Sequence, residues 1–175
     1  MRFVITGGTG TGKTALIEEL ARRGYATIPE GTREYIEEMI ELTGKDPRKD
    51  RAKFQEYICM VRMNDFLKAE GKKEIYFYDR GHYDEKAYCD HFNSPVPLGY
   101  TDFCLNNRYD GLYILPPWPE ILQKDTIRTE SPQEAIEIHK AIIRTYLEDG
   151  YKPIEVPRVG VKERADFVLE HILSK

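Results

Sequence analysis

The sequence predicts an α/β fold in which a parallel β-sheet is covered by helices on both faces. Short apolar runs, typical of strands buried on both sides, alternate with amphipathic stretches along the whole chain. The chain has 175 residues, of which 41% are hydrophobic and 32% charged, enough to build a core and too apolar for a disordered protein. Residues 1–175 are therefore expected to form one domain.

The expected strands are short and lack charged residues in their centres. The first begins almost at the N-terminus with Phe3-Val4-Ile5, and a glycine-rich segment follows it at once. The third, an apolar run of isoleucine and aromatic residues, ends at Asp79. Three prolines close the fourth. The five predicted strands are residues 1–6, 25–28, 75–78, 112–115 and 154–156.

The expected helices carry apolar residues at spacings of three and four, which place these residues on one face. Gly24 ends the first helix, and Ser131 with Pro132 supplies the N-cap and first turn of the sixth. The seven predicted helices are residues 13–23, 30–43, 51–70, 82–92, 98–107, 132–149 and 161–173.

Composition argues against several classes of protein. A net charge of −4 disfavours binding to a nucleic-acid polymer, although a local cationic site remains compatible with a small anion. The three cysteines lack CxxC spacing, so neither a disulfide framework nor a zinc site is expected. No signal peptide or membrane-spanning run is recognised, which favours the cytoplasm. Abundant charged residues with few Asn and Gln favour a thermophilic source.

The glycine-rich segment after the first strand matches the pattern GxxxxGK[ST], with the sequence GGTGTGKT from Gly7 to Thr14. Glycines let successive backbone N–H groups curve around phosphate oxygens, and the following helix directs its positive end at the same anion. Lys13 is expected to contact the β and γ phosphates of ATP, and Thr14 to bind Mg²⁺. The expected nucleotide-binding residues are Gly8, Thr9, Gly10, Thr11, Gly12, Lys13, Thr14 and Ala15.

Two charged residues, Asp79 and Arg80, follow the third predicted strand. Asp79 is expected to hold Mg²⁺ directly or through water, as carboxylates do beside such phosphate-binding loops. Arg80 is expected to contact a phosphate or the acceptor substrate. The alternative for Asp79 is an ordinary polar strand end, and for Arg80 a surface ion pair.

A further pair follows the second predicted strand. The carboxyl ends of parallel strands meet at one edge of a sheet, so Glu30 is expected to face the transferred phosphate and to accept a proton from an acceptor hydroxyl. Arg33, one helical turn later, is expected to hold the acceptor or a phosphate. The alternative is ordinary helix-start chemistry, since acidic residues favour the first turn.

The polar segment after the fourth strand is expected to form a small lid around residues 118–131. A basic lid that closes over a triphosphate excludes water and neutralises developing charge. Arg128 is the preferred residue for this role, with Lys124 second. The alternative is a solvated charged loop. The four histidines show no metal-ligand spacing and are expected at the surface or behind the site.

In order along the chain, ITGGTGTGKT, IPEGTREYIEE, FYDRGHYDEKAY, YILPPWPE with KDTIR, and VPRVGVKERADFVL resemble a family of small single-domain AAA-type P-loop ATPase and kinase-like proteins. More distantly, these motifs are similar to the ribosylnicotinamide kinase domain of the bacterial bifunctional NAD-biosynthesis protein, and to deoxynucleoside and thymidylate kinases. The segment DRGHYD lacks the serine-rich continuation of thymidylate kinases.

The resemblance implies a P-loop nucleoside-kinase-like fold with sheet order 2-3-1-4-5, together with ATP and Mg²⁺. By position, Lys13 and Thr14 match the phosphate loop, and Asp79 with Arg80 matches the DR motif. Glu30 matches the acidic residue after the second strand, and Arg128 the lid arginine.

These motifs favour an ATP- and Mg²⁺-dependent phosphotransferase with catalytic residues Lys13, Glu30, Asp79 and Arg128, acting on a small hydroxyl-bearing metabolite that is nucleoside- or nucleotide-like. Two alternatives stay open: a nucleotide hydrolase or switch without a small acceptor, and a nucleotide-binding module without turnover. The sequence leaves the acceptor and the oligomeric state undetermined.

Overall fold

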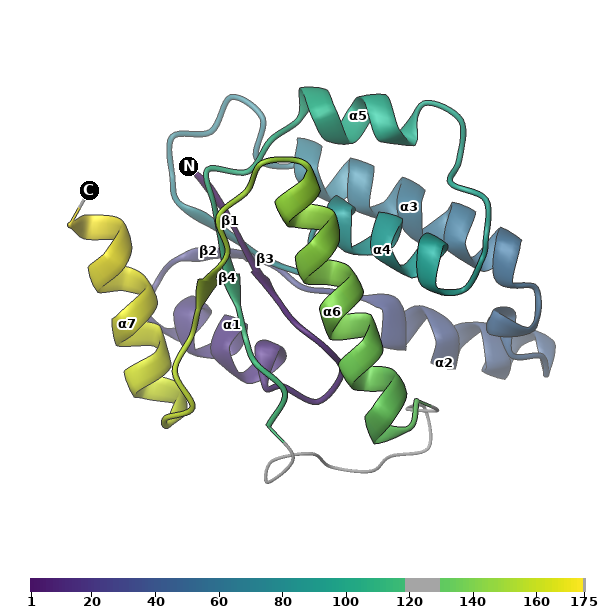
Figure 1. Cartoon of the computed structure of the whole chain (residues 1–175), viewed down its shortest axis with the longest axis horizontal. Coiled ribbons are helices and arrows are strands. Elements are labelled where there is room, and N and C mark those ends of the chain that lie inside the picture. Colours follow the sequence, from purple (N-terminus) through teal and green to yellow (C-terminus); the bar gives the residue numbers. More distant parts are fainter. Residues whose placement is uncertain (119–129, 175) are drawn as a thin grey trace.

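The computed structural model describes residues 1–118 and 130–174 of the chain. In this part, five strands form one parallel sheet in the order β2-β3-β1-β4-β5, which confirms the expected order (Figure 1). β1 lies in the centre, with Ile5 in register with Asp79 of β3 on one side and with Tyr113 of β4 on the other. The strands are β1 (Arg2–Thr6), β2 (Ala26–Ile28), β3 (Tyr76–Asp79), β4 (Gly111–Ile114) and β5 (Ile154–Glu155).

Helices connect the strands, as parallel pairing requires. Two helices, and a 3-10 turn between them, separate β2 from β3, and two more helices separate β3 from β4. The helices are α1 (Lys13–Arg22), α2 (Thr32–Thr43), η1 (Pro47–Lys49), α3 (Arg51–Leu67), α4 (His82–His91), α5 (Tyr100–Asn106), α6 (Pro132–Glu148) and α7 (Val161–Leu173). No helix among the described residues is both long and apolar enough to cross a lipid bilayer.

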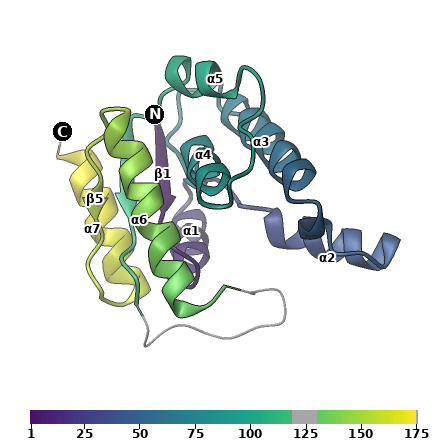
Figure 2. The ribbon, with the colours of Figure 1, turned by 45° about the vertical axis from the view of Figure 1, so that its right-hand side comes forward.

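The sheet buries both faces, since successive side chains of a strand point to opposite sides. On β1, Phe3 and Ile5 pack in a cluster with buried residues of α1 and α7. Val4 lies in a second cluster with residues of α3, α4, α5 and α6. The two groups of helices lie on opposite sides of the sheet in Figures 1 and 2.

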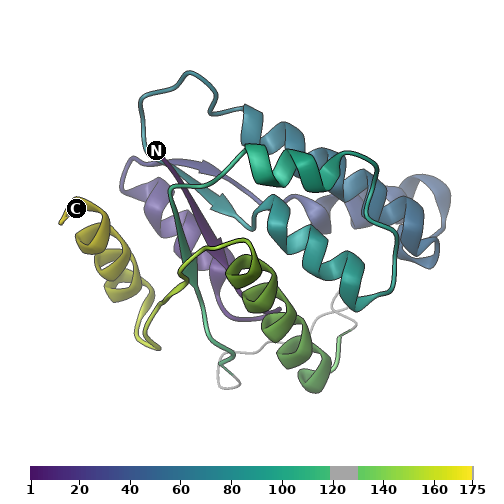
Figure 3. The same ribbon diagram turned by 45° about the horizontal axis from the view of Figure 1, so that its top comes forward.

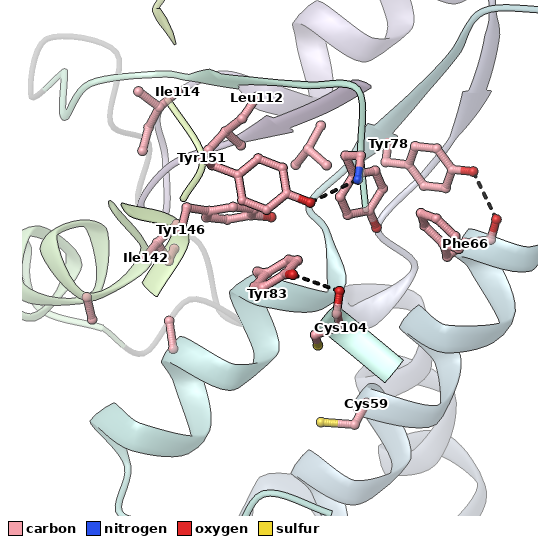
Figure 4. Packing of buried hydrophobic residues seen from close by; sticks show 14 of the residues in the cluster. Cys59, Phe66, Tyr78, Tyr83, Cys104, Leu112, Ile114, Ile142, Tyr146 and Tyr151 are labelled. Carbon is pink, nitrogen blue, oxygen red and sulfur yellow. Dashed lines mark hydrogen bonds between the residues drawn. The ribbon is translucent and has the colours of Figure 1, made fainter. Parts of the chain in front are cut away.

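The cluster on the α4 and α6 side is unusually rich in tyrosine (Figure 4). Burying a phenol without a hydrogen bond is costly, so each hydroxyl needs a partner. Tyr83 donates to the carbonyl of Cys104 at 2.7 Å, and the Tyr151 hydroxyl accepts from the amide of Tyr109 at 2.9 Å. The first bond ties α4 to α5, and the second ties the segment before β4 to the segment after α6. The three cysteines are buried and unpaired, in agreement with the sequence.

α2 begins two residues later than the sequence predicts. Gly31, at φ 69°, occupies the left-handed region just before the helix, so the helix starts at Thr32. Glu30 therefore lies in the connection after β2 and not in the helix as expected. This connection contacts Arg62 in the second half of α3 and Arg80 just before α4. Figure 3 shows α3 and α4 side by side.

Candidate functional site

The phosphate-binding loop leaves the centre of the sheet between β1 and α1. Gly7 has φ 140°, and a Cβ there would lie 2.4 Å from the carbonyl oxygen of Leu115, so only glycine fits. Gly12, at φ 83°, precedes α1, whose first turn has no side-chain cap. The uncapped N–H groups at this helix end and the curved loop form an arrangement suited to an anion.

Lys13 crosses the loop in this structure. Its Nζ donates a hydrogen bond to the carbonyl oxygen of Gly8 at 2.9 Å, and its side chain is buried. Burial, and next the positive charge of Arg80, lower the pKa of Lys13 from 10.5 to about 8. Among the described residues, Nζ therefore has one hydrogen-bond acceptor, and most of its capacity to donate to a bound anion is unused.

Thr14 and Asp79 lie together at the end of β3. The Thr14 hydroxyl donates to Oδ2 of Asp79 at 3.0 Å, while Oδ1 is buried and accepts no hydrogen bond from any described residue. Burial, followed by the nearby charge of Glu30, raises the pKa of Asp79 to about 6. An orphaned carboxylate oxygen beside a hydroxyl fits Mg²⁺, which takes few protein ligands and several from water and phosphate.

The candidate donor set at this site is small, with one hydroxyl and one carboxylate. Among the described residues, no three His, Cys, Asp or Glu side chains lie close enough together to hold an ion. The site therefore fits a metal that arrives with phosphate oxygens.

Glu30 lies between two arginines. Its Oε1 is 3.1 Å from Nε of Arg80 and 3.7 Å from a terminal nitrogen of Arg62. Burial opposes ionisation, but Arg80, Arg62 and Lys13 outweigh it and lower the pKa of Glu30 to about 2. The carboxylate is thus ionised at neutral pH, and it suits orientation of a hydroxyl better than full removal of its proton.

Arg80 turns toward the loop from an unusual backbone conformation. Its φ of 68° lies in the left-handed region, which costs a residue with a side chain on the order of 1–2 kcal/mol. Its guanidinium donates to the carbonyl of Gly7 at 3.2 Å and to Asp84 at 3.4 Å. The strained residue is thus held between the phosphate loop and α4.

Asp84, which the sequence analysis missed, anchors this region. The side chain is fully buried and accepts hydrogen bonds from the Gly81 amide at 2.9 Å and the Tyr146 hydroxyl at 2.7 Å. It also accepts from the hydroxyl of Thr6, at the end of β1. Asp84 therefore links β1, α4 and α6 directly beneath the loop.

His82 differs from the sequence expectation, because it is buried among the aromatic rings of Phe66, Phe103 and Tyr109. His139 is buried behind the loop, which is one of the two expected positions. Nδ1 of His139, on α6, accepts a hydrogen bond from the amide of Gly8 at 3.4 Å. Burial, and then Lys13 and Arg158, lower the pKa of His139 to about 4, so the ring packs behind the loop in its neutral form.

A cavity of about 510 Å³ extends from the phosphate loop to the space between α2, α3 and α4. Most of the predicted site residues line it: Thr9, Gly10, Gly12, Lys13, Thr14, Glu30, Arg33, Asp79 and Arg80. Gly8, Thr11 and Ala15 belong to the same loop and first helical turn without lining the cavity. Arg128, Lys124 and most of the expected lid lie outside the described residues.

The far part of the cavity was not apparent from the sequence. Its walls are Ile36 on α2, side chains of α3 and side chains of α4, and its rim carries Arg48 and Arg51. The α3 and α4 residues that line it are Phe54, Gln55, Ile58, Glu85, Tyr88 and Phe92. They occupy ordinary amphipathic positions, so no sequence signal separates them from core residues.

Comparison with known proteins places the chain in a family and identifies its fold. Residues 2–164 match the model of the family AAA_28, described as an AAA domain. No sequence among the curated proteins matches the chain.

Several solved kinases share the fold. Deoxyadenosine kinase from M. mycoides with dCMP and dCDP bound is 19% identical, with a TM-score of 0.73 over 100% of both chains. NadR protein in complex with NR is also 19% identical, with a TM-score of 0.73 over 98% of this chain and 50% of NadR. Shikimate kinase from Acinetobacter baumannii in complex with shikimate is 18% identical, with a TM-score of 0.60 over 99% and 93% of the two chains.

Proposed function

This chain belongs to the AAA domain family AAA_28 and has the fold of P-loop kinases, and from that premise we propose that it transfers the γ-phosphoryl group of ATP to a hydroxyl of a small metabolite. The observation that carries the proposal is the single cavity that joins the phosphate loop to Glu30 and continues between α2, α3 and α4. A hydrolase needs room only for water beside the γ-phosphate. A cavity of about 510 Å³ favours an acceptor molecule.

The roles follow from charge and position. The loop amides and Lys13 hold the phosphates, and Arg80 adds positive charge where the phosphoryl group is transferred. Glu30 orients the acceptor hydroxyl toward that group. Arg33 at the cavity rim contacts the acceptor, and Arg128 remains the proposed lid residue.

Thr14 and Asp79 would hold Mg²⁺ together with phosphate oxygens and water. The ion supplies neutralisation of the negative charge on the transferring group.

Names of the structural neighbours indicate the acceptors to try first. Deoxyadenosine kinase, NadR with NR, and shikimate kinase with shikimate suggest a panel of nucleosides, ribosides and hydroxylated acids. We expect incubation with labelled ATP and Mg²⁺ to yield a phosphorylated member of this panel. Release of free phosphate at the same rate with and without every acceptor would instead identify a hydrolase.

Lys13→Ala should lower the rate of transfer by about 10²-fold or more, since it removes a charge that neutralises the transferring phosphoryl group. The matched control is Lys72→Ala, which removes an exposed lysine outside the cavity. Circular dichroism should show both variants folded. Equal turnover of Lys13→Ala and wild type would contradict the proposed role of the loop.

A further inference from the structure

Glu85, on α4, is a buried carboxylate that lines the acceptor part of the cavity. Its side chain is only 5% exposed. Among the described residues, only Arg62 donates a hydrogen bond to it, from Nε to Oε1 at 3.1 Å. A carboxylate can accept about four hydrogen bonds, so most of the capacity of Glu85 is unused.

Arg62 places Glu85 and Glu30 on either side of one guanidinium group. Besides its bond to Glu85, it donates to the main-chain carbonyl of Glu30 at 2.7 Å and to the Thr32 hydroxyl at 3.1 Å. The ion pair with the Glu30 side chain measures 3.7 Å. The planar guanidinium is rigid, so the two carboxylates keep a fixed spacing at the wall of the same cavity.

Glu85 is not needed to neutralise Arg62 where α3 packs against α4, because Arg62 has another carboxylate partner. Arg62 already pairs with Asp65, one turn further along α3, at 3.6 Å. A second carboxylate at the cavity wall adds a desolvation cost, which raises the pKa of Glu85. Asp65 does not line the cavity and is paired with Lys68 at 2.5 Å. Of the two buried partners of Arg62, only Glu85 is available to a ligand.

We propose that Glu85 determines specificity by accepting a hydrogen bond from a second hydroxyl of the acceptor, while Glu30 orients the hydroxyl that is phosphorylated. This inference rests on the proposed phosphotransferase function. The acceptor class is then a molecule with two nearby hydroxyl groups, such as a sugar or a cyclic polyol. A neutral hydroxyl suits the position because Arg62 already balances the charge of Glu85.

The test compares two acceptors that differ in one hydroxyl. 2′-Deoxyadenosine has the 5′ and 3′ hydroxyls, and 2′,3′-dideoxyadenosine lacks the 3′ hydroxyl. Nicotinamide riboside and its 3′-deoxy analogue form a second pair. With wild-type protein, ATP and Mg²⁺, we expect the dihydroxy member of at least one pair to have the higher kcat/KM.

Glu85→Gln should reduce that preference about tenfold, mainly through KM, because a neutral amide replaces the charged acceptor of the hydrogen bond. The glutamine oxygen can still accept from Arg62, which keeps α3 and α4 together. Asp65→Asn is the matched control, since it alters another buried partner of Arg62 outside the cavity. It should leave the preference unchanged.

The outcomes separate this inference from the proposed function. Transfer to either member with equal preference in wild type and Glu85→Gln would overturn the role of Glu85 and leave the phosphotransferase in place. An equal loss of preference in Asp65→Asn would also overturn it, because the effect would then come from Arg62. Absence of transfer to all four acceptors and to the wider panel would contradict both proposals.

Discussion

Lys13 carries its charge in a buried position before any nucleotide is bound. Its side chain is 6% exposed, and its nitrogen is bonded to one carbonyl oxygen. Such a placement destabilises the free protein, because an ammonium group loses most of its hydration. Bound phosphate would supply the missing negative charge. We therefore expect Lys13 to lower the stability of the nucleotide-free protein and to strengthen the binding of phosphate.

Lys13→Met should therefore stabilise the nucleotide-free protein at pH 7. The folded-state pKa of about 8 lies below the ordinary 10.5, so the cost is fully present below pH 8 and is relieved as the pH rises to 10.5. Methionine removes a cost on the order of 1–3 kcal/mol, offset in part by the lost bond to Gly8. Urea unfolding at pH 7 and pH 10 measures the difference.

The difference in unfolding free energy between Lys13→Met and wild type should shrink between those two pH values. Gly8 keeps a hydrogen bond from the Thr11 hydroxyl at 3.1 Å in the variant, so the loop retains its fold. A variant that is less stable than wild type at pH 7 would show that the buried charge is already compensated.

A functional role could be predicted from the sequence for some of the site residues and not for others. Lys13 and Thr14 stand in a fixed motif, and Asp79 ends an apolar strand, so the chemistry of each could be expected from its neighbours. Glu85 and Arg62 stand in amphipathic helices with no motif. Their contact joins residues 23 positions apart and exists only after α3 packs against α4.

At the scale of elements, the loop between β1 and α1 depends on its contact with the end of β4. The Leu115 carbonyl oxygen would lie 2.4 Å from a Cβ at Gly7, a distance that real side chains do not tolerate. Leu115 is itself fixed by a hydrogen bond from its amide to Thr6. The loop therefore cannot move away without disturbing the sheet.

Gly7→Ala should abolish nucleotide binding or unfold the loop, as both the clash and φ 140° oppose a side chain there. Gly71→Ala is the matched control: its φ is 69°, and nothing lies within 4 Å of the added Cβ. The control carries backbone strain on the order of 1 kcal/mol without a clash. Equilibrium binding of a fluorescent ATP analogue would distinguish the variants, and equal affinity would refute the assignment of the loop.

The start of α2 is a helix boundary that local sequence rules did not predict correctly. The sequence predicts the second helix from residue 30, because Glu and Thr favour a first turn. The structure starts α2 at Thr32, and Arg62 from α3 holds the carbonyl of Glu30 outside the helix. The left-handed Gly31 and the distant Arg62 side chain together set the position of Glu30.

At the scale of the whole molecule, a negative net charge accompanies a cavity that mixes basic and acidic side chains. The chain carries −4 overall, yet the cavity gathers Lys13, Arg33, Arg48, Arg51 and Arg80. The acidic residues Glu18, Glu30, Glu34, Asp79, Glu85 and Glu130 line the same cavity and balance that charge. Attraction of a triphosphate therefore depends on the cations beside the loop, Lys13 and Arg80, and not on the charge of the cavity as a whole.

Nucleotide should stabilise the whole fold, because binding is linked to unfolding. ATP with Mg²⁺ at 100 times its dissociation constant adds about 2.7 kcal/mol, which for a chain of this size corresponds to roughly 5–10 °C in Tm. Chelation of Mg²⁺ should remove part of this shift. Asp79→Asn should lose the Mg²⁺-dependent part, because it removes the proposed ligand.

Thermal unfolding with ATP, in Mg²⁺ or in chelator, measures this prediction. Asp102→Asn, an exposed carboxylate on α5 outside the cavity, serves as control and should behave as wild type. A nucleotide-induced shift that is identical with and without Mg²⁺ in wild type would argue against the metal role of Asp79 and Thr14.

The order of strands and helices along the chain, the phosphate loop and the residues at the strand ends could all be predicted, because these depend on local patterns of polarity and on glycine. The packing of distant segments, by contrast, brings Glu85 to the cavity in contact with Arg62, and places Asp84 and His139 against the loop. These features depend on contacts between distant segments, which form when α3, α4 and α6 bury their apolar faces together. No short sequence pattern predicts these contacts.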